Sequence, residues 1–390
     1  MNRTVAITGA GGFIGAHLRR WLERQGDVTV RIVDRDDWSD PARLAEKLSG
    51  ADVVFHLAGV NRAPDEEVER TNVELAERLV AALDTSRATT DSTPRIVYAS
   101  STQESRENAY GRSKRAAGDR LLAWAERSGG EASVMILPNV FGPGCRPFYN
   151  SVVATFCRQL ATGQTPQIQV DAEVEFLSVG ELVERMTQYV SDPEAKASRR
   201  VRVEGSRRLF VSELLARLEK IRDAFVPGGV TPDLSDPFER DLHLTYLSHC
   251  EPAGWTREPQ VHADPRGELY EVLKLARGGQ IFFSTTRPGV VRGNHWHSRK
   301  TEWFCVVRGE AIVRLKHVDG GETVEIPVSG ASPRFVAIPA FHVHHIENVG
   351  SDDLLTLFWA SEIFDPADAD TFADGALSVT PVPSAIRAAA

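Results

Sequence analysis

Tyr110 and Lys114 lie four residues apart, so a helix would carry their phenol and ammonium groups on the same face. Such a pair suits proton transfer to an oxygen that gains negative charge, because a nearby cation lowers the pKa of a phenol. Reduction of a ketone by hydride is a reaction of this kind, and the same groups serve the reverse oxidation. We expect Tyr110 to be the acid and Lys114 to tune it.

The reaction also needs a hydroxyl that holds the carbonyl oxygen, and Ser101 is the candidate. It follows the apolar run Arg95–Ala99, which is typical of a buried parallel strand. A tyrosine and a lysine at this spacing are common on surface helices, but here they follow a strand that ends in serines. We therefore expect Ser101, Tyr110 and Lys114 to act together.

A glycine-rich turn follows the first apolar run, Thr4–Thr8, and precedes a helical pattern that contains Leu18 and Leu22. Its GxxGxxG spacing lets backbone N–H groups approach a pyrophosphate at the start of a helix. A dinucleotide is expected to contact Gly9, Gly12, Phe13, Ile14 and Gly15.

Asp34 and Arg35 close the second apolar run, Val28–Val33, and favour different dinucleotides. An acidic residue at this place hydrogen-bonds the ribose 2′-hydroxyl of NAD, whereas an arginine accepts the 2′-phosphate of NADP. The two residues by themselves leave the choice open. Lys114 is expected to hold the ribose of the nicotinamide.

Histidine and glutamate side chains form a second chemical pattern in the last third of the chain. His295 and His297 would point to the same face of a strand, Glu302 can return from the next strand, and His344 follows later. Three imidazoles and one carboxylate suit zinc, iron, nickel or manganese, and zinc is the metal we expect.

Composition and element order predict two domains in this chain of 390 residues. Up to about Leu137, β-branched runs alternate with amphipathic helical stretches, which predicts a doubly wound parallel sheet. After Asp264, short alternating strands and glycine turns predict an all-β barrel or jelly roll. Proline and glycine gather between these parts, and we expect a first domain at 1–245 and a second at 246–390.

The charge and the cysteines bear on partners and compartment. A net charge of -9 argues against a nucleic-acid partner, which would need clustered cations. The four cysteines lack metal-ligand spacing, a strand-like run directly follows Met1, and no apolar run reaches the roughly 20 residues of a membrane span. We expect a cytoplasmic protein without membrane insertion.

Two families resemble parts of the chain. The glycine turn with Tyr110 and Lys114 resembles the extended short-chain dehydrogenases, which have a Rossmann fold. The stretch Gly289–Gly309 resembles the first cupin motif, GX5HXHX4EX6G, and 339–348 resembles the second. Phe341 stands where the second motif usually has glycine. The cupin resemblance implies a jelly-roll barrel that holds its metal with the four residues named above.

The stretch from Asp264 to His295 also resembles the dTDP-sugar 3,5-epimerases, which are cupins as well. In those enzymes the histidine at the position of His295 is the base that abstracts a proton, so His295 matches two roles. The resemblance implies that Arg266 and Arg292 clasp the diphosphate of a substrate.

Taken end to end, the chain is similar to the bifunctional capsular-polysaccharide biosynthesis enzymes of the CapF type. The similarity also rests on four further stretches, which are Val54–Arg62, Leu137–Gly142, Tyr149–Cys157 and Leu244–Ser248. It implies that the cupin epimerises C3 of a UDP-4-keto-6-deoxy-HexNAc and that the first domain then reduces the C4 ketone with NADPH. It also implies a zinc-containing homodimer, and Asn139 is expected to contact the substrate.

Two other hypotheses stay open at this point. In the first, the cupin serves only structure and dimerisation, and the protein is a plain NADP-dependent reductase. Alternatively, both domains bind ligands without reacting and the protein is regulatory. The intact Tyr110 and Lys114 argue against the regulatory hypothesis, because sensors of this kind commonly lose the proton donor.

Overall fold

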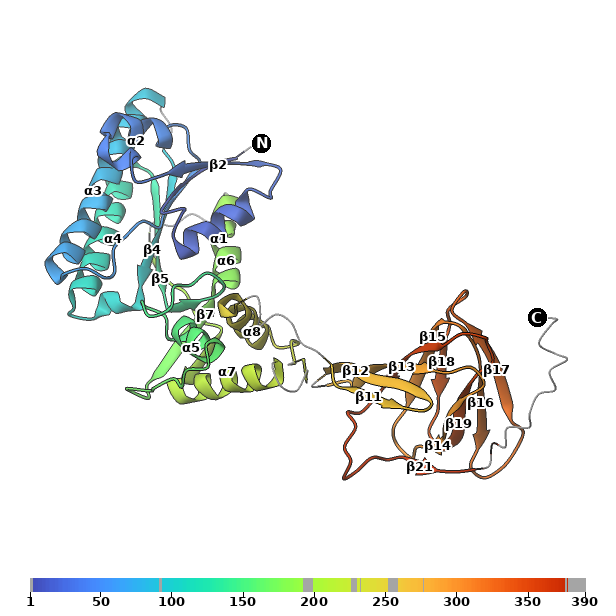
Figure 1. The fold of residues 1–390 in the computed structure, drawn as a ribbon. Coiled ribbons are helices and arrows are strands. Elements are labelled where there is room, and N and C mark those ends of the chain that lie inside the picture. The colour runs from blue at the N-terminus through green and yellow to red at the C-terminus, as the bar shows by residue number, and fades with distance from the viewer. Residues whose placement is uncertain are drawn as a thin grey trace. The chain divides into compact units, whose positions relative to one another are not determined.

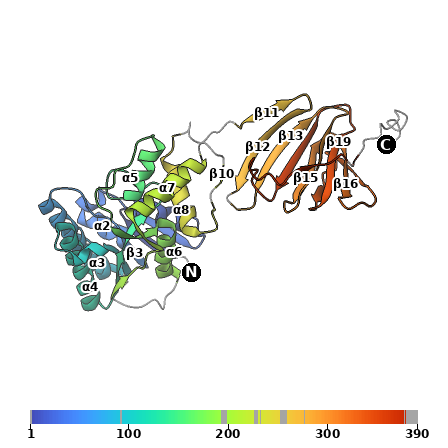
Figure 2. The same cartoon turned by 90° about the horizontal axis from the view of Figure 1, so that it is seen from below.

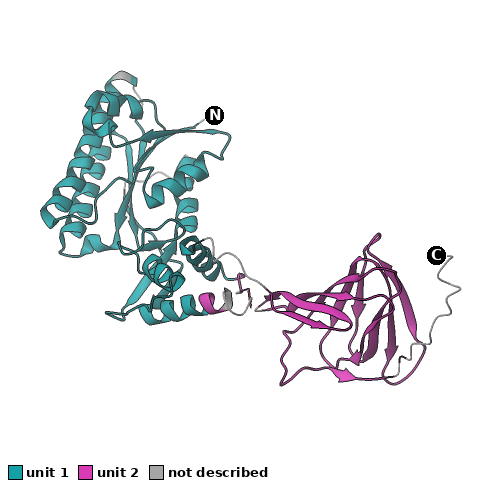
Figure 3. Ribbon diagram, viewed as in Figure 1, with its two compact units in different colours: residues 1–220, 236–251 teal, residues 221–235, 252–390 magenta. Residues whose placement is uncertain are grey.

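The computed structural model describes residues 3–90, 93–191, 199–225, 230–231, 233–251, 259–275, 277–375 and 377. The chain forms two compact units, one of residues 1–220 and 236–251 and one of residues 221–235 and 252–390 (Figure 3). The boundary that we expected at 245/246 falls inside helix α8 (Pro237–His249) and stays a prediction. The proline- and glycine-rich residues 226–229 and 252–258 lie outside the described part of the chain.

The first unit is built on a six-stranded parallel sheet with the order β2-β1-β3-β4-β5-β8 (Figure 1). Its strands are β1 (Arg3–Thr8), β2 (Val28–Val33), β3 (Val53–His56), β4 (Arg95–Ser101), β5 (Glu131–Leu137) and β8 (Arg199–Arg202). The strand order reverses between β1 and β3, and ligands of open α/β sheets bind in the crevice at such a point. The predicted doubly wound sheet is confirmed.

Helices cover both faces of this sheet (Figure 1). One face carries α2 (Pro41–Leu48), α3 (Asp65–Thr90) and α4 (Ala109–Ser128), and the other carries α1 (Phe13–Leu22) and α6 (Val179–Ser191). Each face has its own apolar core, with Trp124 and Tyr98 fully buried in the first and Leu18 and Phe55 in the second. None of the helices in the described residues combines the length and apolar composition of a membrane span.

The remaining elements of this part of the chain extend the carboxyl end of the sheet. A small sheet has the order β6-β7-β9. The elements are β6 (Asn139–Phe141), β7 (Glu173–Ser178), β9 (Arg207–Phe210), α5 (Val152–Ala161), α7 (Val211–Phe225) and the 3-10 helices η1 (Asp37–Ser39) and η2 (Thr102–Ser105).

The second unit consists of two sheets stacked around one core (Figure 2). One sheet has the order β10-β12-β13-β20-β15-β18 with β11 beside β12, and the other has the order β17-β16-β19-β14-β21. The strands are β10 (Val230–Thr231), β11 (Val261–Asp264), β12 (Gly267–Leu275), β13 (Gln280–Thr286), β14 (Val291–Trp296), β15 (Glu302–Arg308), β16 (Glu310–His317), β17 (Val324–Ser329), β18 (Phe335–Ile338), β19 (His342–Asn348), β20 (Leu354–Ala360) and β21 (Phe372–Ala373). The predicted all-β, jelly-roll class is confirmed.

Phe341 occupies the turn between β18 and β19 in a left-handed conformation, with φ of 59°. Its N–H donates to the carbonyl of His297 at 2.7 Å, and its carbonyl accepts from Val318 at 3.0 Å. The turn therefore keeps the backbone that a glycine adopts freely, and a side chain in this conformation costs about 1–2 kcal/mol.

Candidate active site and metal centre

The glycine-rich turn between β1 and α1 has no room for side chains at two of its glycines. Gly9 has φ of 72°, and a Cβ on it would lie 2.7 Å from the nitrogen of Ala58. A Cβ on Gly15 would overlap the carbonyl oxygen of Gly9. Gly12 precedes α1 without a side-chain cap, so the first N–H groups of the helix face the turn where a pyrophosphate would bind.

We expect Gly15→Ala to abolish dinucleotide binding and to destabilise the unit by about 1–3 kcal/mol, because the turn must open to admit the methyl group. Gly11→Ala is the matched control, since no atom lies within 4 Å of a Cβ there. Calorimetric titration with NADP and thermal unfolding of both variants check this expectation. Equal binding by the two variants would contradict it.

A buried histidine that the sequence did not single out ties β1 to β3 at the crevice. Thr8 Oγ1 lies 2.8 Å from His56 Nδ1 and accepts from the N–H groups of Leu57 and Ala58 at 3.2 Å each. Burial lowers the pKa of His56 to about 3, so its ring is neutral where it shares the hydrogen bond with the Thr8 hydroxyl. The ring also stacks on Tyr98, with centroids 5.3 Å apart.

Ser101, Tyr110 and Lys114 come from the end of β4 and the start of α4. The Lys114 ammonium donates to the carbonyl of Ala99 at 2.8 Å and lies 4.8 Å from the ring centre of Tyr98 and 5.8 Å from that of Tyr110. Ser101 ends the strand and accepts a hydrogen bond from the N–H of Gln103 at 3.2 Å. Lys114 thus joins the end of β4 to the start of α4.

Burial sets the protonation of this pair. It raises the pKa of Tyr110 to about 12, with a smaller contribution from Tyr149, and lowers the pKa of Lys114 to about 8. The lowered pKa that we expected for the phenol of Tyr110 is therefore not found, because burial is the dominant influence and raises the pKa. Tyr110 is therefore fully protonated at neutral pH, which is the form that an acid needs.

Asp34 and Arg35 are both exposed after β2. Oδ1 of Asp34 accepts hydrogen bonds from the N–H groups of Asp36 at 3.0 Å and Asp37 at 3.3 Å. The pKa of Asp34 is lowered, mainly by the hydrogen bond from the backbone of Asp37. One carboxylate oxygen is therefore engaged in its own turn. Asp34 also lines an open groove of about 850 Å³, together with Arg31, Arg43 and Lys47.

The residues expected at the substrate lie in both units. Asn139 is exposed at the start of β6. Arg266 pairs with Asp264 at 2.6 Å, and Nη2 of Arg292 lies 3.8 Å from the same carboxylate. Nη2 of Arg292 is buried and has no hydrogen-bond partner among the described residues. The two arginines thus meet around one acidic group.

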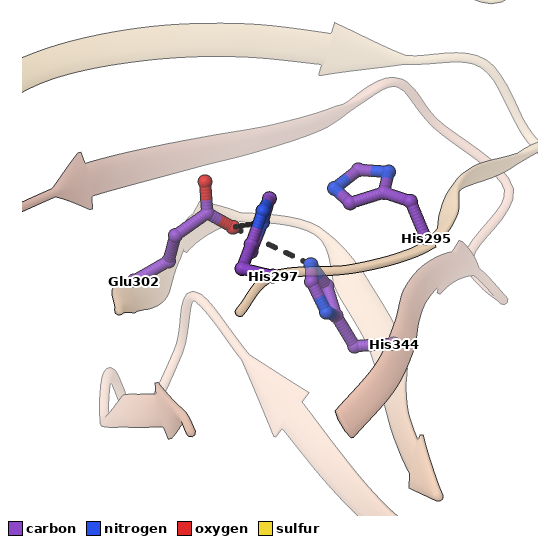
Figure 4. A group of neighbouring side chains, drawn as sticks. All are labelled: His295, His297, Glu302 and His344. Atoms are coloured by element: carbon purple, nitrogen blue, oxygen red, sulfur yellow. Dashed lines mark ion pairs between the residues drawn. The ribbon is translucent and has the colours of Figure 1, made fainter. Parts of the chain in front are cut away.

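Four potential metal ligands come together inside the second unit, as Figure 4 shows. The ligand atoms of His295, His297, Glu302 and His344 all lie within 4.8 Å of one another. Glu302 Oε2 is 3.3 Å from His297 Nε2 and 3.4 Å from His344 Nε2. His295 stands beside them, with its ring centre 4.6 Å from that of His344.

The hydrogen bonds of the cluster leave the inward nitrogens free for an ion. Nδ1 of His297 lies 2.6 Å from the carbonyl oxygen of Asp370, and Nδ1 of His344 lies 3.0 Å from that of His342. Each Nδ1 therefore carries a proton, and the buried Nε2 atoms have no hydrogen-bond partner in the described residues. Burial lowers the pKa of His295 to about 4, so the imidazole of His295 is neutral.

The carboxylate of Glu302 is ionised in this cluster. Burial alone would raise its pKa, but the neighbouring rings of His297 and His344 hold the pKa well below its usual range. Neutral imidazoles and an ionised carboxylate are the ligand forms that a divalent metal requires. The donor set thus fits a zinc ion.

A β-bulge in β14 directs His295 into the cluster. The pairing with β19 shifts between Gly293 and His295, where Asn294 has φ of 61° and its side chain lies 2.8 Å from Nδ1 of His345. His345 and His342 themselves lie outside the cluster, the latter beside Ala340 and the ring of His317.

Comparisons with known proteins agree with this two-part architecture. Residues 5–203 match the model of the NAD dependent epimerase/dehydratase family, and residues 262–372 match that of the polysaccharide biosynthesis C-terminal domain. The UDP-2-acetamido-2,6-beta-L-arabino-hexul-4-ose reductase of Pseudomonas aeruginosa is 36% identical over 371 residues, which cover 95% of this chain and 98% of that protein. Ceramide reductase of Caulobacter vibrioides is 34% identical over 159 residues, 36% of this chain and 47% of its own.

A solved structure matches the chain over nearly its whole length. The capsular polysaccharide assembling protein CapF from Staphylococcus aureus has a TM-score of 0.81 and 31% identity, over 95% of this chain and 99% of that one. The chain therefore belongs to the NAD dependent epimerase/dehydratase family, and within it to the two-domain, CapF-type proteins of polysaccharide biosynthesis.

Proposed function

We propose that this protein is a bifunctional nucleotide-sugar enzyme. Its second unit epimerises C3 of a UDP-4-keto-6-deoxy-HexNAc, and its first unit reduces the C4 ketone with NADPH, for capsular or other cell-surface polysaccharide. The observation that carries the proposal is the presence of two candidate sites in one chain. One unit has Tyr110 and Lys114 beside the end of β4, the strand that Ser101 closes, and the other unit has the four-donor cluster. The name of the Pseudomonas aeruginosa relative, a hexul-4-ose reductase, supports the substrate class.

The reduction follows from the protonation of the first site. NADPH, when bound, supplies the hydride that forms the new C–H bond at C4. Ser101 holds the ketone oxygen, and Tyr110 transfers its phenolic proton to that oxygen as negative charge develops there. Lys114 supplies a positive charge beside the phenol and binds the ribose of the nicotinamide. The product is the 4-hydroxy sugar.

Epimerisation must come first, because the C4 ketone acidifies the C3 proton and reduction removes that ketone. Zinc, when bound by His295, His297, Glu302 and His344, supplies a fixed positive charge in the barrel. Arg266 and Arg292 hold the diphosphate of the substrate. Before the substrate binds, Asp264 aligns the two guanidinium groups.

NADP is the preferred dinucleotide in this proposal. One oxygen of Asp34 is engaged in its own turn. Arg31, Arg43 and Lys47 line the groove beside it together with Glu46, and these cations are the groups that would contact a 2′-phosphate. Assays of 4-ketosugar reduction at 340 nm with NADPH and NADH test both the reaction and the cofactor. Equal kcat/KM for the two would overturn the NADP assignment, and no oxidation of either would overturn the reductase.

NADP affinity is expected to fall as pH rises above about 8. Lys114 has its pKa lowered to about 8 by burial, and its cationic form is the one that binds the dinucleotide. The dissociation constant should therefore be flat below pH 8 and rise by at most about tenfold per pH unit above it. Fluorescence titrations between pH 7 and 9.5 measure this, and a Lys114→Met variant that keeps the same slope would contradict it.

The proposal extends to a homodimer formed through the second unit. One sheet of this unit contains β13, β15, β18 and β20, and its outward face is apolar. In the described part of the chain, Trp303 is 42% exposed and Phe335 is 59% exposed on this face. The face comprises Ile281, Phe283, Trp303, Phe335, Leu357 and Trp359. A second copy would cover it, and light scattering that gives a monomer mass would contradict this.

A further inference from the structure

Asp370 lies far from the four potential ligands in the sequence but contacts the backbone that carries two of them. It belongs to a segment, 368–374, that runs beside β14 and the loop after it. β21 within this segment pairs with β14, so that Ala373 faces His295 and Phe372 faces Trp296. The ring of Phe372 stacks on that of Trp296 with centroids 4.5 Å apart.

The carboxylate of Asp370 organises the loop that joins His297 to Glu302. Its Oδ1 accepts from the N–H and hydroxyl groups of Ser298 at 3.0 and 2.5 Å. Its Oδ2 accepts from the N–H groups of Arg299 at 3.0 Å and Lys300 at 2.8 Å. Three consecutive N–H groups thus converge on one anion, as in an anion-binding nest, and the side chain is only 6% exposed.

The main chain of the same residue orients a ligand directly. The carbonyl oxygen of Asp370 accepts the Nδ1 proton of His297 at 2.6 Å, which leaves Nε2 to face the cluster. Asp370 adopts φ of 43°, a conformation that aspartate and asparagine tolerate better than most residues. In this left-handed conformation the carbonyl of Asp370 points to His297, and its side chain accepts the hydrogen bonds of the loop after His297.

We propose that Asp370 is a positioning residue of the metal centre, which fixes the tautomer of His297 through its carbonyl and the His297–Glu302 loop through its carboxylate. The inference rests on the proposed zinc site. Outer-sphere partners of metal-bound histidines of this kind contribute to both affinity and coordination geometry. Asp370 itself donates no atom to the ion, because both of its oxygens are taken by N–H groups.

The test compares zinc and cobalt binding by the full-length protein and three variants, measured by chelator competition and visible absorption. Asp370→Ala is expected to bind zinc about 10–100-fold more weakly than the wild type and to change the cobalt spectrum. Asp370→Asn keeps one acceptor oxygen and the backbone preference, so its zinc affinity should lie between those of the wild type and Asp370→Ala. Asp368→Asn is the matched control in the same segment, because Asp368 pairs only with the exposed Arg299 in the described structure, and it should bind like the wild type.

Each outcome decides the inference. A cobalt spectrum and a zinc affinity within twofold of the wild type in Asp370→Ala would overturn it, while the metal site would stand. If Asp370→Ala does not fold, Ser298→Ala removes a single hydroxyl from the same carboxylate and should weaken zinc binding measurably; unchanged binding there would count against the inference. A wild-type protein that binds neither metal would overturn the zinc site and the role of Asp370 together, and would leave the reductase of the first unit untouched.

Discussion

Tyr110→Phe is expected to lower kcat for reduction of the 4-ketosugar by about 10²–10⁴-fold, the usual worth of a positioned general acid. The variant deletes only the hydroxyl that delivers the proton to the C4 oxygen. NADP binding should be unchanged, because Lys114 keeps its hydrogen bond to Ala99. Stopped-flow oxidation of NADPH under single-turnover conditions isolates the step from product release.

Tyr189→Phe is the control for that experiment, since it removes a phenol from α6 in the apolar core on the other face of the sheet. It should keep the wild-type rate. A Tyr110→Phe variant with more than about a tenth of the wild-type kcat would assign the proton transfer to another group. The raised pKa of Tyr110 adds a second check, because ionisation of this phenol should cause no loss of rate between pH 7 and about pH 10, well below its pKa of about 12.

His344→Ala is expected to weaken zinc binding by at least about 100-fold, because one of four donors is lost from a closed site. His342→Ala is the matched control two residues earlier on β19. The His342 ring lies outside the cluster, and the carbonyl that orients His344 belongs to its main chain. Metal analysis after dialysis against a chelator distinguishes the two variants, and equal retention of zinc would contradict the site.

The same variant separates the two proposed activities. His344→Ala should lose exchange of the C3 proton while its first unit still reduces a 4-ketosugar that is already epimerised. Loss of both activities in a folded variant would show that the metal centre serves the whole protein rather than one reaction.

Local spacing predicted a large part of the sites. Gly9 and Gly15 face backbone in the turn, as their spacing after a strand suggests. The predicted convergence of His295 and His297 with Glu302 and His344 is present, although a β-bulge interrupts β14 before His295 and His297 lies just after the strand. These relations depend on a few neighbouring residues or on known strand geometry. A sequence pattern can predict such relations because the backbone geometry of a turn or strand fixes the distances between the residues involved.

Two properties of the sites depend on long-range packing and could not be predicted from the sequence. The pKa of Tyr110 rises because the folded chain buries it, a balance that spacing does not reveal. Asp370 contacts residues about seventy positions earlier through a segment without a recognisable motif.

The most direct test of the bifunctional assignment is NMR in deuterated buffer, with the purified protein, zinc and a UDP-4-keto-6-deoxy-HexNAc, first without and then with NADPH. We expect deuterium to enter C3 before NADPH is added and a 4-hydroxy sugar carrying this deuterium to form afterwards. Consumption of NADPH without deuterium at C3 would contradict the bifunctional assignment and leave a reductase whose all-β unit is structural. Absence of both reactions would contradict the substrate class.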